Sequence, residues 1–157
     1  MVPLTIDVES IHSSGALSLL YAAQDELRRR YSHDDDAPSL SNDELAPPGG
    51  VFLVARWDEH LAGGVGLRSI GDPAQHVGEV KRLWVRPDLR RHGVAAALMN
   101  AVEEYARSTQ YHQLYLETGW AQPEAQAFYP RTGWTSVADF PPGAACHPNS
   151  YRFFKVL

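Results

Sequence analysis

The most informative stretch of the sequence reads Glu79-Val-Lys-Arg-Leu-Trp-Val-Arg-Pro-Asp-Leu-Arg-Arg-His-Gly-Val-Ala95. We expect a strand over 77–85, because β-formers are dense there and Pro87 then stops strand pairing. A basic turn with Gly93 leads into a helix whose apolar residues recur at helical spacing through about Ser108. Such a junction points backbone N–H groups and the positive helix end at one spot, which suits an anion as wide as a pyrophosphate. The alternative is an ordinary turn with surface arginines.

Outward from this junction, the sequence predicts a mixed α/β domain with helices packed against one sheet. Helical spacing predicts a helix from Ser14 to about Ser32, and a polar connector over 33–50 has room for a helical turn near 42–45. We expect the large apolar residues of the first helix to share one face, namely Leu17, Leu20, Tyr21, Leu27 and Tyr31. Strands are expected over 5–8, 51–57, 61–70, 112–117, 134–138 and 151–156, and a short helix over 123–131.

Composition narrows the class of protein further. The chain has 157 residues, 44% of them hydrophobic, which is typical of one soluble globular domain. The longest uncharged apolar stretch, 94–102, is about half a membrane span, and the N-terminus lacks the pattern of a signal peptide. The single cysteine, Cys146, fits a reducing cytoplasm. A net charge of −5 argues against general nucleic-acid binding.

Two motifs together resemble the signatures of the GNAT superfamily of N-acetyltransferases. Arg90-x-x-Gly93-x-Ala95 is similar to the acetyl-CoA-binding motif Arg/Gln-x-x-Gly-x-Gly/Ala. The second signature, a strand followed by a short helix with an aromatic–Tyr pair, is similar to residues 116–134, which contain Phe128-Tyr129 and Gly133-Trp134. The resemblance over 79–134 implies a single domain across residues 1–157, with a central, mostly antiparallel sheet flanked by helices. Pro130 departs from the family's pattern. A proline inside a helix bends the helix, which would shift Tyr129.

The resemblance also implies a co-substrate, acetyl-CoA, and residues that bind it. The family uses a backbone N–H of the strand near 83–85 to stabilise the oxyanion, and Tyr129 would protonate the departing CoA thiolate. In this turn, Arg90 and Arg91 add positive charge at the rim. The cofactor-binding residues implied are Leu83, Trp84, Val85, Arg90, Arg91, His92, Gly93, Val94, Ala95, Gln122, Ala125 and Phe128.

Glu79 is the candidate general base. Acetyl transfer to an alkyl amine, whose pKa is near ~10, requires the neutral amine, and a nearby carboxylate can take the proton. Glu79 lies eleven residues before Arg90, where several family members carry their base. The alternative is a strand charge paired with Lys81 or Arg82. For Tyr129, the alternative is a core aromatic beside Phe128.

These observations predict an enzyme, an N-acetyltransferase that transfers acetyl from acetyl-CoA to a primary amine of a small molecule. The alternatives are a protein lysine or N-terminal acetyltransferase, a catalytically silent acyl-CoA-binding domain and, more remotely, a nucleotide-binding domain. The acceptor cleft would lie near 31–45 and 140–152. The acidic run 33–36 suggests a cationic acceptor, since anionic rims attract cations, and is not expected to hold a metal. We expect no membrane partner, and the family resemblance allows a homodimer.

Overall fold

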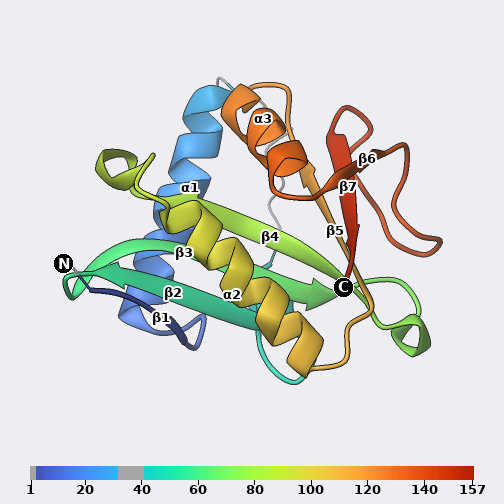
Figure 1. Cartoon of the computed structure of the whole chain (residues 1–157), viewed down its shortest axis with the longest axis horizontal. Helices are drawn as coiled ribbons and strands as arrows, with labels where there is room; N and C mark the ends of the chain where they lie inside the picture. Colours follow the sequence, from blue (N-terminus) through green and yellow to red (C-terminus); the bar gives the residue numbers. More distant parts are fainter. Residues whose placement is uncertain (1–2, 32–40) are drawn as a thin grey trace.

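The computed structural model describes residues 3–31 and 41–157. Within these residues, one seven-stranded sheet carries a helix on each face and a third helix beside its C-terminal strands (Figure 1). The strands are β1 (Leu4–Val8), β2 (Val51–Trp57), β3 (His60–Ser69), β4 (Val77–Val85), β5 (Gln113–Thr118), β6 (Thr135–Val137) and β7 (Tyr151–Val156). The helices are α1 (Ser14–Arg30), α2 (Val94–Ser108) and α3 (Pro123–Arg131), with short 3₁₀ turns η1 (Asn42–Leu45), η2 (Pro73–Gln75) and η3 (Pro87–Leu89).

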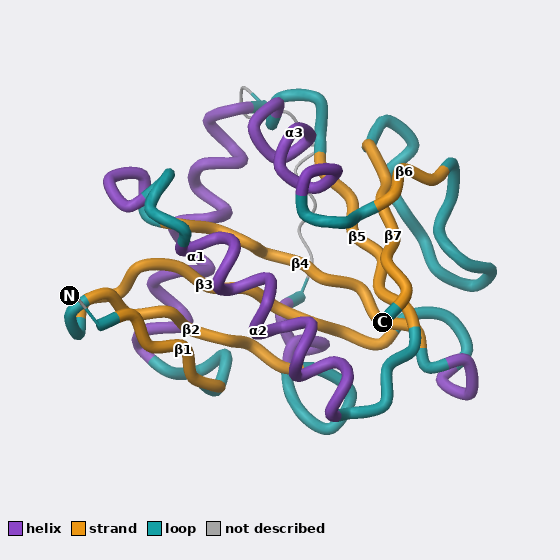
Figure 2. The backbone as a smooth tube through the Cα atoms, viewed as in Figure 1, coloured by secondary structure: helices purple, strands orange, loops and turns teal. Residues whose placement is uncertain are grey.

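The strand order is β1-β2-β3-β4-β5-β7-β6, and every neighbouring pair except β4–β5 is antiparallel. The expected mixed α/β fold with a mostly antiparallel sheet is therefore confirmed. The parallel pair is short, because only Val77–Glu79 lie opposite Gln113–Tyr115. Past these residues β4 and β5 diverge, and Figure 2 shows the two strands running apart above their paired ends.

A β-bulge bends β4 just after it leaves β5. Opposite β3, the register passes from Gly66↔Lys81 to Gly64↔Trp84, so β4 holds one extra residue there. Arg82 takes the left-handed conformation at this point, with φ of 61°. Bulges bend a strand and increase its twist, and this one turns the end of β4 away from β5.

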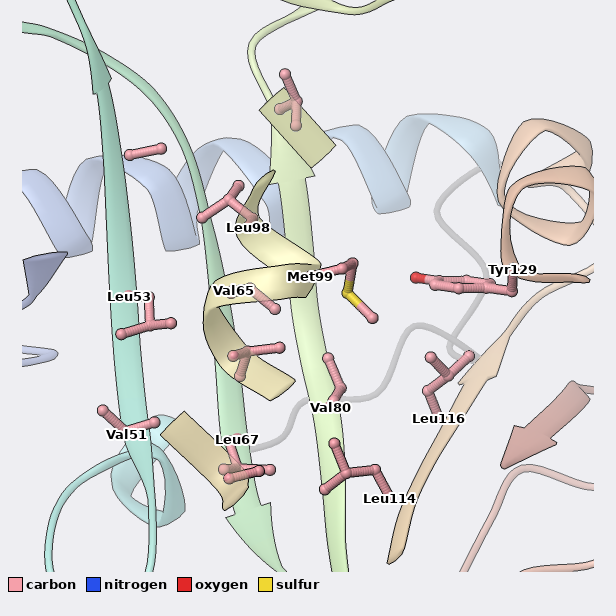
Figure 3. Close-up of a cluster of buried hydrophobic side chains, with 14 of the residues drawn as sticks. Val51, Leu53, Val65, Leu67, Val80, Leu98, Met99, Leu114, Leu116 and Tyr129 are labelled. Carbon is pink, nitrogen blue, oxygen red and sulfur yellow. The ribbon is translucent and has the colours of Figure 1, made fainter. Parts of the chain in front are cut away.

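The main core lies between α2 and the sheet. Helix α2 buries the apolar stripe Val94, Leu98, Met99, Val102 and Ala106 against residues of β2, β3, β4 and β5 (Figure 3). The stripe recurs every three to four residues, which places it on one helical face. This helix has the bounds expected from the sequence, and it carries the Gly93 turn at its N-terminus. None of the helices in residues 3–31 and 41–157 is long and apolar enough to cross a membrane.

Helix α1 covers the other face, and here the expected buried face was wrong in part. Its buried residues are Gly15, Ala16, Leu19, Leu20 and Ala23, whereas Leu17 and Tyr21 are 38% and 73% exposed. The start of the helix is in close contact with side chains of the sheet, since a Cβ added at Gly15 would lie 2.9 Å from the end of the Arg56 side chain and 3.2 Å from Leu61 Cδ2. Close approach selects the stripe that contains small residues and turns the larger Leu17 and Tyr21 outward.

Candidate active site

The turn before α2 has the backbone geometry of an anion site. Arg91 and Gly93 are left-handed, with φ of 66° and 84°, and Gly93 is the N-cap of α2 without a side-chain cap. A Cβ built at Gly93 would meet nothing within 4 Å, so the protein itself leaves the space above this residue open. The positive end of α2 therefore faces open space beside the exposed Arg91 and His92.

Arg90 has a different environment from the free rim charge that we expected. Its Nε donates a hydrogen bond of 2.9 Å to the carbonyl of Val85, and a terminal nitrogen lies 2.7 Å from Oε1 of Glu26 on α1. The guanidinium also stands 5.9 Å from the centre of the Trp84 ring. Arg90 thus ties the turn to the end of β4 and to α1, and its charge is balanced by Glu26.

Two buried polar atoms without hydrogen-bond partners lie on the diverging strands. Trp84 Nε1 is on β4 and Thr118 Oγ1 is at the end of β5, and neither has a partner among the described residues. Buried polar groups are almost always paired in native proteins, so such orphans indicate a missing ligand or water. The polar pantetheine arm of CoA, with its two amides, suits this pair, while the Gly93 turn suits its pyrophosphate.

Glu79 lies at the point where β4 leaves β5, since it is the last β4 residue paired with that strand. The side chain is 1% exposed, and Oε1 accepts a hydrogen bond from Arg68 Nε at 2.8 Å and forms an ion pair with a terminal Arg68 nitrogen at 2.7 Å. Lys81 Nζ is 3.7 Å from Oε2. Burial raises the pKa of Glu79, and the cations Lys81 and Arg68 oppose that rise without cancelling it.

The ion pair with Lys81, which was one alternative for Glu79, is therefore present, but the nearer partner, Arg68, was missed. The signal was in the sequence: strands 61–70 and 77–85 form a hairpin, and its register places Arg68 directly opposite Glu79. Opposite charges on facing residues of an antiparallel pair attract each other.

Tyr129 is buried on α3 at 7% exposure, among the rings of Phe128, Trp134 and Phe153. Figure 3 shows its hydroxyl pointing from α3 toward Met99 of α2. Burial raises the pKa of Tyr129 above the usual value for a tyrosine. Helix α3 continues through Pro130 to Arg131, so the proline leaves Tyr129 inside the core. Both expected roles, core aromatic and proton donor, are compatible with this position.

The loop between β5 and α3 is held by the end of α1. Arg30 donates a hydrogen bond of 2.9 Å to the carbonyl of Ala121 and forms ion pairs with Glu26 and Glu124. Tyr31 Oη accepts a hydrogen bond from the Ala121 amide at 3.3 Å. Glu26 is shared with Arg90, so this network connects the turn before α2 to the start of α3. Sequence reasoning missed the network, because its residues belong to three distant segments.

The other predicted cofactor residues lie either at the end of β4 and the start of α2 or at the start of α3 and along it. Gln122 is the N-cap residue of α3, and its Oε1 accepts a hydrogen bond from the Gly119 amide at 3.2 Å. Val85 and Val94 are buried in the main core, against which the half-buried Leu83, Ala95, Ala125 and Phe128 pack. The turn residues and the α3 residues thus lie on opposite sides of the divergence between β4 and β5.

In the region where we expected the acceptor cleft, Glu117 organises the segment before β7. Its Oε2 accepts hydrogen bonds from the His147 amide at 2.9 Å and from Ser150 Oγ at 2.7 Å. Cys146 packs against the small cluster of Ile70, Val77 and Phe140. The acidic run 33–36, on which the expected cationic acceptor depends, lies outside the described residues.

Comparison with known proteins identifies the family. The model of the acetyltransferase (GNAT) family matches residues 17–134, well over half of the chain. The chain belongs to this family. N-acetyltransferase 8 of Homo sapiens is 32% identical over 101 residues, which are 63% of this chain and 44% of that protein. IAA acetyltransferase of Azospirillum brasilense is 36% identical over 98 residues, which are 62% of this chain and 63% of that protein.

The chain thus spans between 44% and 63% of the length of these two relatives. Among solved structures, the PaiA N-acetyltransferase of Thermoplasma acidophilum in complex with coenzyme A aligns with a TM-score of 0.72. The alignment covers 99% of each chain at 16% sequence identity, so it establishes a shared fold.

Proposed function

We propose that this chain transfers the acetyl group of acetyl-CoA to a primary amine of a small molecule. The observation that carries the proposal is the position of Glu79, a buried carboxylate at the point where β4 and β5 diverge. The Gly93 turn lies at the far end of β4, and Tyr129 lies across the divergence on α3. Membership of the GNAT family, and the names of the relatives, support the same chemistry.

Acetyl-CoA would lie where β4 and β5 diverge, between the turn before α2 and the start of α3. The backbone of residues 90–95 would hold the pyrophosphate at the N-terminus of α2. Trp84 Nε1 and Thr118 Oγ1 would pair with the polar groups of the pantetheine arm, which would satisfy both orphaned atoms. Bound there, acetyl-CoA supplies a thioester, whose carbonyl carbon is attacked by the amine.

Glu79 would take the amine proton. Its Oε1 is committed to Arg68, so Oε2 is the atom left to accept a proton. Burial raises the pKa of Glu79, which makes its carboxylate a stronger base. The amine nitrogen then forms a bond to the acetyl carbon as its proton passes to Oε2.

Tyr129 would complete the transfer on the other side. As the carbon–sulfur bond breaks, the thiolate leaves as a base with a pKa of about 8.5. The Tyr129 hydroxyl is protonated at neutral pH and would donate a proton to the sulfur. The products are the acetylated amine and free CoA.

The test measures the release of CoA from acetyl-CoA with a thiol reagent. The acceptors supplied are free primary amines in one set of reactions and peptides that offer a lysine or an N-terminal amine in the other. We expect faster turnover with free small amines than with peptides. Faster turnover with peptides would favour a protein acetyltransferase. Calorimetric binding of CoA without release by any amine would favour a silent acyl-CoA-binding domain.

A further inference from the structure

One oxygen of the Glu79 carboxyl group is held by a single arginine of the neighbouring strand. Arg68 lies directly opposite Glu79 in the β3–β4 pair. Its Nε donates a hydrogen bond of 2.8 Å to Oε1, and a terminal nitrogen lies 2.7 Å from the same oxygen. Two nitrogens of one planar guanidinium therefore fix the direction of Oε1. The carboxyl group cannot rotate without breaking both contacts.

The other oxygen of Glu79 has looser surroundings. Lys81 Nζ lies 3.7 Å from Oε2, within the range of an ion pair but beyond hydrogen-bond distance. Glu79 is the last residue of β4 that pairs with β5, so the two strands part directly after it. In the proposed reaction Oε2 takes the amine proton, and its position depends on how firmly Arg68 holds Oε1.

The short turn η1 holds Arg68 from the opposite side. Glu44 of η1 forms an ion pair with Nη1, the guanidinium nitrogen that does not contact Glu79. Leu45, the next residue, is buried in the apolar cluster that also contains residues of α1. Arg68 and Asn42 border a cavity of about 10 Å³, and one water there would pair with the orphaned Asn42 Oδ1. The guanidinium is thus fixed between an anchored turn and the candidate base.

Stability alone does not explain the pair of Arg68 and Glu79. Both side chains are largely buried, at 17% and 1% exposure. Taking two charges out of water costs about as much as their attraction returns, so a buried ion pair is often no more stabilising than an apolar pair. Removal of one partner, by contrast, leaves the other charge buried and without its counterion. A buried ion pair at the divergence of the strands therefore indicates a role in the reaction.

Arg68 also affects the protonation of Glu79. The charged and titratable groups around Glu79 come from four elements: Arg68 of β3, Lys81 and Arg82 of β4, Tyr115 and Glu117 of β5, and Glu44 of η1. Burial raises the pKa of Glu79 and Glu117 adds to the rise, while the charges of Lys81 and Arg68 oppose it. Loss of Arg68 would remove the cation in direct contact with the carboxyl group, so the pKa would rise further.

We infer that Arg68 is a positioning residue for the reaction: by its two-point contact with Oε1 of Glu79, it directs Oε2 toward the acceptor amine. In this role Arg68 acts through Glu79 and transfers no proton itself. The inference rests on the proposed acetyltransferase function and adds the residue that sets the orientation of the base.

The test measures kcat and KM against pH, with the full chain, acetyl-CoA and the primary amine that turns over fastest. Arg68→Met removes the charge and the donors but keeps much of the side-chain bulk. We expect kcat near pH 7 to fall about 10- to 100-fold, because a misdirected base loses the geometry of proton transfer, while KM for acetyl-CoA stays within about 3-fold. The acid limb of kcat should move to higher pH by about one unit or more, as a carboxylate does when it loses a neighbouring arginine.

Arg68→Lys separates charge from geometry. Lysine supplies a positive charge as a point, without the planar fork that contacts Oε1 twice. The acid limb should return toward its wild-type position, whereas kcat should recover only in part. Full recovery of kcat by lysine would overturn the positioning role, because charge alone would then be sufficient.

A double variant shows whether Arg68 acts through Glu79. Once Glu79→Gln has removed the base, Arg68→Met should lower kcat by no more than about 2-fold further. Additive losses would overturn the inference. Arg56→Met is the matched control, because Arg56 of β2 also pairs with a glutamate, Glu9, and its strand lies two places from β4 in the sheet. It should leave the acid limb unchanged, even if it lowers the melting temperature.

Carboxyl ¹³C NMR gives a measurement that does not depend on turnover. The signal that disappears in Glu79→Gln belongs to Glu79, and its titration midpoint should be higher in Arg68→Met than in the wild type. If Arg68→Met does not fold, the partial recovery expected for Arg68→Lys still tests the inference. Unchanged kcat and acid limb in folded Arg68→Met would overturn the inference and leave the acetyltransferase function standing. Absence of acetyl transfer by the wild type to every amine and peptide, with CoA still bound, would overturn the proposed function together with the inference.

Discussion

Gly119 lies under the Tyr31 ring, at the contact between α1 and the loop that leads to α3. A Cβ built on Gly119 would stand 2.7 Å from Tyr31 Cζ and closer still to the hydroxyl oxygen. Real Cβ contacts do not approach below 3.0 Å, so Gly119→Ala forces either the ring or the loop to move. Moving the ring also loses the hydrogen bond from the Ala121 amide to Tyr31 Oη. We expect Gly119→Ala to be destabilising.

The size of the destabilisation caused by Gly119→Ala follows from the contacts involved. Overpacking costs about 1–3 kcal/mol, and one weak hydrogen bond adds about 0.5–1.5 kcal/mol. Since the tyrosine is half-buried and can yield, we expect a loss of about 1–3 kcal/mol in the free energy of unfolding. In a domain of this size each kcal/mol lowers the melting temperature by roughly 2–4 °C.

The assay is a double-mutant cycle in urea, with Gly119→Ala, Tyr31→Ala and the double variant. Once the ring is removed, the added methyl group has space, so the two losses should be less than additive by about 1 kcal/mol or more. CoA affinity should fall in Gly119→Ala, because the displaced loop carries Gln122. A Gly119→Ala variant as stable as the wild type, or strictly additive losses, would refute the close contact.

Three further predictions concern the candidate site. Gly93→Val should weaken CoA binding at least about 10-fold by calorimetry, because a β-branched residue resists φ of 84° and would occupy the space above the turn; unchanged affinity would exclude this turn as the anion site. Glu79→Gln should lower kcat about 10²–10⁴-fold near pH 7. In the wild type the rate should fall as pH drops through the Glu79 pKa, which burial places above 4.5, and this acid limb should vanish in the variant. Tyr129→Phe should lower kcat but change the unfolding free energy by less than about 1 kcal/mol, since no hydrogen bond of its hydroxyl occurs among the described residues; a stability loss with unchanged kcat would make Tyr129 a core residue only.

Much of the fold could be predicted because local signals agreed with one another. The strands over 51–57, 77–85 and 151–156 and the helices over 94–108 and 123–131 have the expected bounds. Each is delimited by a proline, a glycine or a change of hydrophobic period, which act within a few residues of sequence. The face of α1 could not be predicted in the same way. Which of its residues are buried depends on contacts with side chains of distant strands, such as Arg56 beside Gly15, and no local pattern encodes such contacts.

The residues of the candidate site likewise differ in whether local sequence predicts their roles. Glu79, Tyr129 and the Gly93 turn lie in one continuous region of sequence with recognisable spacing. Arg68, Lys81 and Asn42 have meaning only through their neighbours, because the charge beside Glu79 is set by strand register and by the packing of η1. Expectations about the acceptor, drawn from net charge and from the run 33–36, therefore had less basis than those about the cofactor.

The ion pairs of α1 explain how the turn before α2 and the start of α3 keep their positions although they belong to different motifs. Glu26 holds Arg90 and, through Arg30, reaches Glu124 at the start of α3. Each of these side chains is partly exposed, so each pair alone contributes little to the free energy of unfolding. The four charges together connect α1 to the turn before α2 and to the start of α3. The loss of one ion pair would therefore release two segments that would otherwise meet only at a bound cofactor. We therefore expect this network to influence CoA affinity more than stability, which would make α1, outside both signature motifs, part of the cofactor-binding machinery.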